Sequence, residues 1–312
     1  MSHREGGRQA GQGKYLTLYP DLSMMIGNAG TLASRHSPNC GSSSLIEIIK
    51  VILLGIVEGI TEFLPISSTG HLIVAVALLK PEISIEGTFE IFIQIGAVVA
   101  VIAYYWSDIW QQARTVRTDQ TVQRLWLGII IAAMPAGLAA FALRSLIKEA
   151  LFNPTVVAIS LIIGGIVLIL IERRPLRETN TTALKAISLR QALLVGIAQT
   201  VALIPGVSRS AASIIGGMMG GLDRQTATQF SFYLAIPTLG GATIIDLLLS
   251  LDELQPNDLV YLVVGAVVSG IVAWLAIRWL LRYVASHNFV QFGIYRVIAG
   301  IVILILVAAT VL

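Results

Sequence analysis

The chain has 312 residues, of which 55% are hydrophobic and 12% are charged, and its formal net charge at pH 7 is +3. Soluble globular domains carry about 25% charged residues, so this composition excludes a soluble enzyme and predicts a polytopic, all-α membrane protein. The small net charge gives no reason to expect a nucleic-acid partner. The single cysteine, Cys40, excludes an intrachain disulfide and a thiolate metal site.

The N-terminal 44 residues differ from the rest of the chain. Residues 1–44 are rich in Gly, Ser, Asn and Arg, and their longest apolar patch, near Met24, is too short for the core of a signal peptide. We expect a polar, disordered extension, or a start codon placed upstream of a true start at Met24 or Met25. A single integral membrane domain is expected over 45–312.

From residue 45 onward, apolar segments of helical length alternate with breaks at proline, glycine or charge. Six of them are long enough to cross a bilayer, at about 89–106, 125–147, 154–172, 229–250, 258–281 and 293–312. Two pairs of shorter helices are expected at 45–64 and 66–79, and at 187–204 and 209–222. The second helix of each pair is too short to cross, so we expect two re-entrant helical hairpins with protein-buried tips.

The basic residues are divided unequally between the two sides that this order implies. Twelve Lys or Arg residues, Arg296 among them, fall in loops expected on one side, at 107–124, 172–190, 223–228 and 278–296. Three fall in loops expected on the other side, at 80–88, 144–153 and 251–257. The positive-inside rule makes the first side cytoplasmic, which places both chain ends outside.

An offset of 141 residues brings two related motifs into register. It lays GIVEGITEFLPISSTGH, at 55–71, on GIAQTVALIPGVSRS, at 196–210. Each copy of the repeat, about 45–172 and about 187–312, holds one hairpin and three spans. An odd number of spans inserts the second copy upside down, so we expect an inverted-topology repeat whose two hairpin tips meet, as in inverted-repeat transporters.

The first break carries carboxylates, hydroxyls and a histidine. Glu58 and Glu62 are four residues apart and share a helix face, and two such carboxylates repel unless a cation lies between them. Mg²⁺ or Ca²⁺ accepts oxygen ligands of this kind. Beyond the break, the hydroxyl of Ser68 and the imidazole of His71 are three residues apart, close enough to interact on one helical turn.

The second break carries an arginine among hydroxyls. After Pro205-Gly206 the chain runs through Ser208, Arg209, Ser210 and Ser213 at the start of a helix. Helix N-termini bind phosphate, and an arginine offers two parallel donors to its oxygens. The amides at Ser67–Gly70 form the symmetric counterpart. Two anion-binding helix ends beside a carboxylate pair favour phosphoryl transfer, which depends on positioning and charge stabilisation.

Structural roles are open for several of these residues. A lone intramembrane serine often joins helices, so Ser67 and Ser210 could do only that. Glu90 and Glu172 are expected to reach the interface from helix ends, and Asp246 is expected to be interfacial or to cap a helix. Four charged or titratable groups are too costly in hydrocarbon for a structural role alone: Glu58, Glu62, His71 and Arg209.

At these residues the chain resembles the undecaprenyl-diphosphate phosphatase family, the bacitracin-resistance membrane proteins. The matching stretches are EGITEFLPISSTGH (58–71), FEIFIQIGAVVAV (89–101), PGVSRSAAS (205–213) and FSFYLAIP (230–237). The resemblance implies hydrolysis of undecaprenyl diphosphate to the monophosphate and inorganic phosphate, with bacitracin resistance as a consequence. It also implies a place in the bacterial plasma membrane with the site facing outward, where the reaction recycles the lipid carrier of cell-wall synthesis.

The resemblance also implies roles for individual residues. The catalytic positions fall on Glu58, Glu62, Ser68, His71 and Arg209. The phosphate-binding arginine of the family falls on Arg209, and flanking motif positions fall on Gly206, Ser208, Ser210 and Ser213, the last a threonine in most of the family. From the symmetric helix start, Ser67 and Thr69 are also expected to bind the phosphate. The resemblance implies dependence on Mg²⁺ or Ca²⁺, and the carboxylate pair Glu58 and Glu62 is the expected metal site.

Two mechanisms remain open at this point. In the first, Ser68 attacks the terminal phosphorus while His71 and Glu62 handle its proton; in the second, His71 is the nucleophile. A flippase or other inverted-repeat transporter is the main alternative function. An intramembrane serine protease ranks below it, because the glutamates and Arg209 have no place in that chemistry. The substrate partner is a polyprenyl diphosphate lipid, and a homodimer stays open as the oligomeric state.

Overall fold

The computed structural model describes residues 42–81, 86–143, 153–173, 181–250 and 256–312. The predicted N-terminal extension lies outside these residues, apart from the first turn of a helix that begins at Ser42. Most of the predicted loops at 144–153 and 251–257 also lie outside them.

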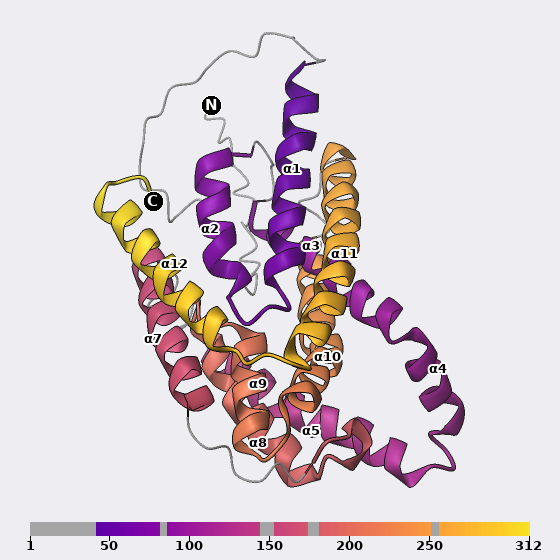
Figure 1. Ribbon diagram of the computed structural model, residues 1–312. Coiled ribbons are helices and arrows are strands. Elements are labelled where there is room, and N and C mark those ends of the chain that lie inside the picture. The colour runs from indigo at the N-terminus through magenta and orange to yellow at the C-terminus, as the bar shows by residue number, and fades with distance from the viewer. Residues whose placement is uncertain (1–41, 82–85, 144–152, 174–180, 251–255) are drawn as a thin grey trace, which may run out of the picture.

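The described residues form a bundle of helices (Figure 1). Their bounds are α1 Ser42–Thr61, α2 Ser68–Leu79, α3 Glu86–Tyr104, α4 Trp106–Thr115, α5 Gln120–Ala142, α7 Pro154–Arg173, α8 Leu189–Thr200, α9 Arg209–Met219, α10 Arg224–Ser250, α11 Pro256–Val284 and α12 Val290–Ala308. Single 3₁₀ turns occur at Leu184–Ala186 and Val201–Leu203. Five helices among the described residues are long and apolar enough to cross a membrane, and α3 with α4 makes a sixth if this bent pair is one span. The prediction of a polytopic helical membrane protein is therefore confirmed.

The segment at 107–124, predicted to be a loop, begins with a helix instead. Helix α4 turns away from α3 by 68° and leaves the bundle (Figure 1). Its indole rings Trp106 and Trp110 stack one turn apart with centroids 6.0 Å apart, and the Arg114 guanidinium lies 4.9 Å from the Trp110 ring. Tryptophans backed by a cation are typical of a helix lying in the membrane interface. Polar residues separate the two tryptophans, so this segment has no apolar run of the kind that predicts a helix elsewhere in the chain.

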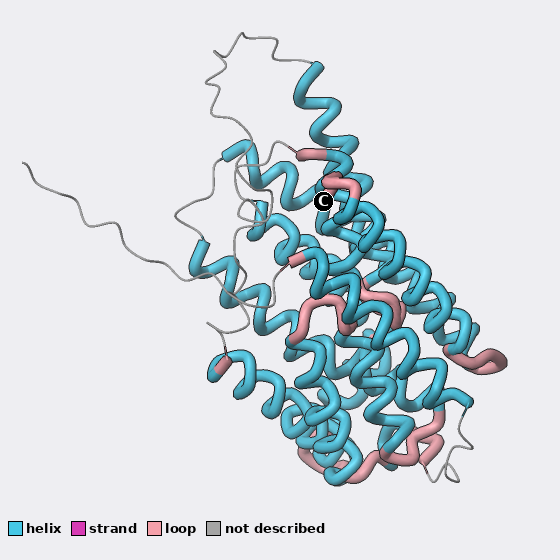
Figure 2. Tube along the Cα trace, turned by 90° about the vertical axis from the view of Figure 1, so that its left-hand side faces the viewer, coloured by secondary structure: helices cyan, strands magenta, loops and turns pink. Residues whose placement is uncertain are grey.

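Both predicted pairs of short helices are present. Helices α1 and α2 form one hairpin and α8 and α9 the other, and the two enter the bundle from opposite ends (Figure 1; Figure 2 shows the bundle turned by 90°). Proline at Pro65 and Pro205 interrupts the helical hydrogen bonding at each break. The residue before each returning helix, Ser67 or Ser208, takes a left-handed conformation with φ of 74° or 71°. The two breaks therefore share the conformation of the residue that precedes the returning helix.

The first helix of each hairpin packs against the second long helix of the other half of the chain. Helix α1 lies along α11, where Gly59 sits against the carbonyl of Ser269, and α8 lies along α5, where Gly196 sits against Ala132. Glycine at such contacts lets two helix backbones approach closely. Because α5 and α11 stand 141 residues apart, the packing repeats with the same offset as the motifs.

Gly206 is the glycine whose conformation the second break requires. Its φ is +91°, and a Cβ built there would collide with the carbonyl of Val157 in α7. We expect Gly206→Ala to destabilise the protein by about 2 kcal/mol, since strain and a backbone collision add. The measurement is the Tm of the purified protein in detergent, which should fall by several degrees.

The matched control is Gly137→Ala. Gly137 lies in α5, and a Cβ there meets nothing within 4 Å, so its Tm should stay the same or rise slightly. An unchanged Tm for Gly206→Ala would show that the break relaxes at little cost.

Candidate active site

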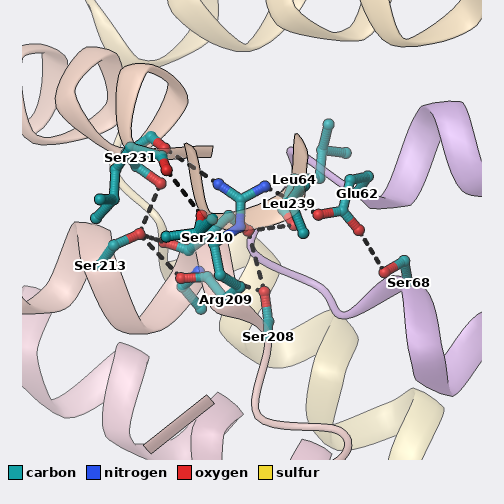
Figure 3. Close-up of polar contacts among 12 residues, drawn as sticks. Glu62, Leu64, Ser68, Ser208, Arg209, Ser210, Ser213, Ser231 and Leu239 are labelled. Atoms are coloured by element: carbon teal, nitrogen blue, oxygen red, sulfur yellow. Dashed lines mark hydrogen bonds and ion pairs between the residues drawn. The ribbon is translucent and has the colours of Figure 1, made fainter. Parts of the chain in front are cut away.

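The structure brings the two breaks into direct contact. Arg209, the first residue of α9, places Nη2 2.9 Å from Oε1 of Glu62 at the end of α1 (Figure 3). The Ser210 hydroxyl donates to the carbonyl of Leu64 across the same junction, at 2.9 Å. Residues almost 150 positions apart thus form one polar cluster inside an apolar bundle.

Glu62 is the centre of this cluster. Its Oε2 accepts a hydrogen bond from the Ser68 hydroxyl at 2.7 Å, while its Oε1 is paired with Arg209 (Figure 3). Its side chain is only 6% exposed, so little water competes for these contacts. A carboxylate that accepts from a serine hydroxyl is placed to act as its general base.

Arg209 is held from three sides. Its Nη1 donates to the carbonyl of Ser231 in α10 at 3.1 Å, and its guanidinium lies 5.6 Å from the Phe63 ring. Its Nε has no hydrogen-bond partner among the described residues. A buried guanidinium with an unused donor, at the start of a helix, can take a phosphate oxygen without first being reorganised.

The other serines of the second break are bonded within the protein. Ser208 caps α9 by accepting from the amide of Ala211, and its hydroxyl lies 3.0 Å from that of Ser210. Ser213 lies 2.6 Å from the Ser231 hydroxyl and donates to the Arg209 carbonyl at 2.9 Å. In this structure the Ser210 hydroxyl therefore joins α9 to the first break, and the Ser213 hydroxyl joins α9 to α10.

The serines and threonine at the first break are arranged differently. Ser67 is buried and precedes α2 without making a capping hydrogen bond. Thr69 is half-buried in the first turn of α2. The start of this helix thus keeps backbone donors that no cap uses.

His71 forms no hydrogen bond with Ser68, and the predicted pairing of hydroxyl and imidazole is wrong. Its Nδ1 lies 2.7 Å from the carbonyl oxygen of Ser67, one turn back, and its Nε2 lies 2.6 Å from the Tyr295 hydroxyl in α12. The Ser68 hydroxyl is engaged by Glu62 instead. Both side chains lean toward the helix N-terminus, as helical geometry dictates, but they lean toward different partners.

Glu58 fits the role of a metal ligand. Its carboxyl group is fully buried, and neither oxygen accepts a hydrogen bond from a donor in the described part of the chain. Its charged neighbours are Glu62 and Glu90, which repel it, and Arg209, which attracts it. No group of three or more His, Cys, Asp or Glu side chains able to hold a metal occurs among the described residues. Two carboxylates nevertheless suit Mg²⁺, which commonly takes its other ligands from water and substrate phosphate.

Arg296 was expected in a cytoplasmic loop, and this prediction is wrong. It is fully buried in α12, and its guanidinium donates to the carbonyls of Pro65 at the first break and of Gly206 and Val207 at the second. Those bonds measure 3.3, 3.2 and 2.8 Å. One side chain therefore ties both breaks together. An arginine inside an apolar segment was the signal that could have identified it.

Two acidic residues also differ from expectation. Glu172 does not reach the interface but is buried, pairing with Arg224 at 2.6 Å and accepting from the amide of Phe289 at 3.0 Å. Asp246, expected to be interfacial or to cap a helix, is fully buried in α10. Glu90 is half-buried near the start of α3. The partners of Glu172 could not be predicted from the sequence, because they come from helices that are distant along the chain.

Comparison with known proteins places the chain in a known family. The family described as "Bacitracin resistance protein BacA" matches residues 51–302. A protein of Deinococcus radiodurans named "Undecaprenyl-diphosphatase" is 49% identical over 265 residues, which cover 84% of this chain and 96% of that protein. One of the same name from Albidiferax ferrireducens is 48% identical over 265 residues, covering 83% and 95%.

Proposed function

The chain belongs to the bacitracin resistance protein BacA family, and we propose that the cluster of Glu62, Ser68 and Arg209 is its active site. The chain is an undecaprenyl-diphosphatase: it dephosphorylates undecaprenyl diphosphate and so recycles the lipid carrier of cell-wall synthesis. The observation that carries the assignment of the centre is the buried chain of contacts from Ser68 through Glu62 to Arg209.

For the membrane architecture we propose six spans and two re-entrant hairpins in an inverted repeat. Helix α3 is the sixth span and α4 lies at the interface, which the 68° bend between them supports. The exchange of packing partners between α1 and α8 supports the repeat. With Arg296 removed from the count, eleven basic residues (12 − 1) remain on the proposed cytoplasmic side and three on the other, so the site faces the external side of the plasma membrane.

The reaction begins with the Ser68 hydroxyl attacking the terminal phosphorus. Its proton passes to Oε2 of Glu62, 2.7 Å away, and then to the leaving undecaprenyl phosphate as the anhydride bond breaks. Water next attacks the phosphoserine, Glu62 takes the water proton, and Ser68 recovers a proton as inorganic phosphate leaves. Arg209 and the first-turn amides of α2 and α9 stabilise the charge on the phosphate oxygens.

Glu58 and Glu62 would hold a divalent cation beside the phosphates. When bound, such an ion polarises a phosphoryl oxygen and offsets the repulsion between the two carboxylates. Glu58 takes part in no proton transfer in this proposal, because no donor in the described part of the chain reaches it.

The test is phosphate release by purified protein in detergent from undecaprenyl diphosphate, with and without a chelator. We expect inorganic phosphate to be released, at least about 10-fold more slowly after chelation, with recovery on adding Mg²⁺ or Ca²⁺. A flippase or other transporter would move the lipid without releasing phosphate. The absence of phosphate release under every metal condition would therefore contradict the assignment as a phosphatase. Release that is indifferent to the chelator would overturn the metal site alone.

A further inference from the structure

Tyr295 forms a contact that the proposed mechanism does not use. Its phenol oxygen lies 2.6 Å from Nε2 of His71, and the two rings stack with centroids 5.6 Å apart and planes 4° apart. The two residues are 224 positions apart, on α12 and α2. A short hydrogen bond together with a parallel stack fixes both the position and the rotation of the imidazole.

The hydrogen bond at Nδ1 of His71 determines which ring nitrogen carries the proton. The Ser67 carbonyl oxygen, 2.7 Å from Nδ1, can only accept a hydrogen bond. Nδ1 therefore carries a proton, and in the neutral ring Nε2 keeps its lone pair and accepts from the Tyr295 hydroxyl. The lone pair through which His71 would act as a nucleophile or base is covered by the phenol.

The carbonyl that His71 holds belongs to a strained residue. Ser67 has φ of 74° and ψ of 103°, a region that residues with a side chain rarely adopt. It makes no capping hydrogen bond of its own, and it directly precedes Ser68. The equivalent residue of the second break, Ser208, has the same φ but holds its turn with its own hydroxyl, which accepts from the amide of Ala211. The first break replaces that cap by a side chain anchored from α12.

We propose that Tyr295 is a positioning residue: it orients His71 so that the imidazole clamps the Ser67 carbonyl and holds the Ser68 hydroxyl on Glu62. The neighbouring Arg296, on the same helix, bonds to the Pro65 carbonyl on the other side of this break, so α12 anchors the break at two points. The proposal rests on the proposed function for its kinetic consequence, but the contact itself can be tested without any substrate.

The first measurement is the rate at which diethylpyrocarbonate modifies His71, followed by mass spectrometry of the peptides. This reagent attacks an unprotonated ring nitrogen. In Tyr295→Phe the ring stack stays and the lone pair is uncovered, so we expect His71 to react about 10-fold faster, the equivalent of one lost hydrogen bond. The wild-type protein, treated in parallel, is the reference for each variant.

Tyr283→Phe is the matched control, because the Tyr283 hydroxyl bonds Gln291 at 3.0 Å and not His71. It should leave the His71 rate and the phosphatase activity unchanged. An unchanged His71 rate in Tyr295→Phe would overturn the proposal, whether or not the wild-type protein releases phosphate. A wild type that releases none while the His71 rate still rises would overturn the proposed function alone.

Kinetics supply the second measurement. Tyr295→Phe should lower kcat about 10-fold with KM unchanged, because a displaced nucleophile slows the reaction step and not the binding of the lipid. In a His71→Ala background the same substitution should have no further effect, since Tyr295 acts through His71. Effects that add in the double variant, or a rise in KM equal to the fall in kcat, would contradict the positioning role. The comparison of Tyr295→Phe in the wild-type and His71→Ala backgrounds remains valid if the substitution lowers stability.

Discussion

Replacing Arg209 by alanine is expected to lower kcat/KM by about 10³-fold or more. An arginine that stabilises a transferring phosphoryl group contributes 10³ to 10⁵ in rate in other phosphoryl-transfer enzymes. Here its loss also leaves the buried carboxylates of Glu58 and Glu62 without their nearby cation. The measurement is steady-state phosphate release by the purified variant, at several metal concentrations.

Two further variants make that result specific. Arg209→Lys keeps the charge but not the pair of parallel donors, so we expect it to recover only a small part of the activity. Arg278→Ala removes an exposed arginine whose guanidinium lies 5.6 Å from the Trp274 ring, and it should retain full activity. An Arg209→Ala protein that keeps its fold and more than about a tenth of its activity would remove Arg209 from the mechanism.

The second large effect concerns Ser68. The Ser68→Ala variant should lose at least about 10³-fold in kcat, as enzymes do when a covalent nucleophile is removed. Rapid quenching with substrate labelled in its terminal phosphate should trap label on Ser68 of the wild type and none in the variant. The geometry behind this expectation is the 2.7 Å bond to Glu62, which gives Ser68 a base, whereas the His71 lone pair is covered by Tyr295.

The competing mechanism makes an opposite prediction for the same experiment. If His71 is the nucleophile, Ser68→Ala still accumulates label, and the label is found on the histidine. Thr200→Ala is a suitable control, since this hydroxyl lies near the second break but bonds the Ile197 carbonyl of its own helix. It should turn over and label like the wild type.

The positions of the two breaks could be predicted from the sequence because their causes are local. A proline or glycine ends a helix wherever it lies, and the cost of charge in hydrocarbon singles out Glu58, Glu62, His71 and Arg209 whatever their partners. The 141-residue offset added the expectation that the breaks are related.

The contacts between distant helices could not be predicted in the same way. Arg296 and the Pro65 carbonyl are 231 residues apart, and positive charge near a helix end reads as a loop until packing shows it buried. The direction of His71 depended on Tyr295, which no spacing rule connects to it. Helix α4 was missed for another reason, since its aromatic stripe is short and its remaining residues are polar.

The exchange of packing partners between the halves has a consequence for how the protein is made. Helix α1 emerges from the ribosome about 200 residues before α11, the helix that covers it. Until the chain is nearly complete, α1 lacks the helix that packs against it, and the two breaks lack the Arg296 side chain that bonds their carbonyls. We therefore expect the centre to assemble late in biogenesis, and a chain that ends before α12 to carry the motifs of both breaks without the enzyme's activity.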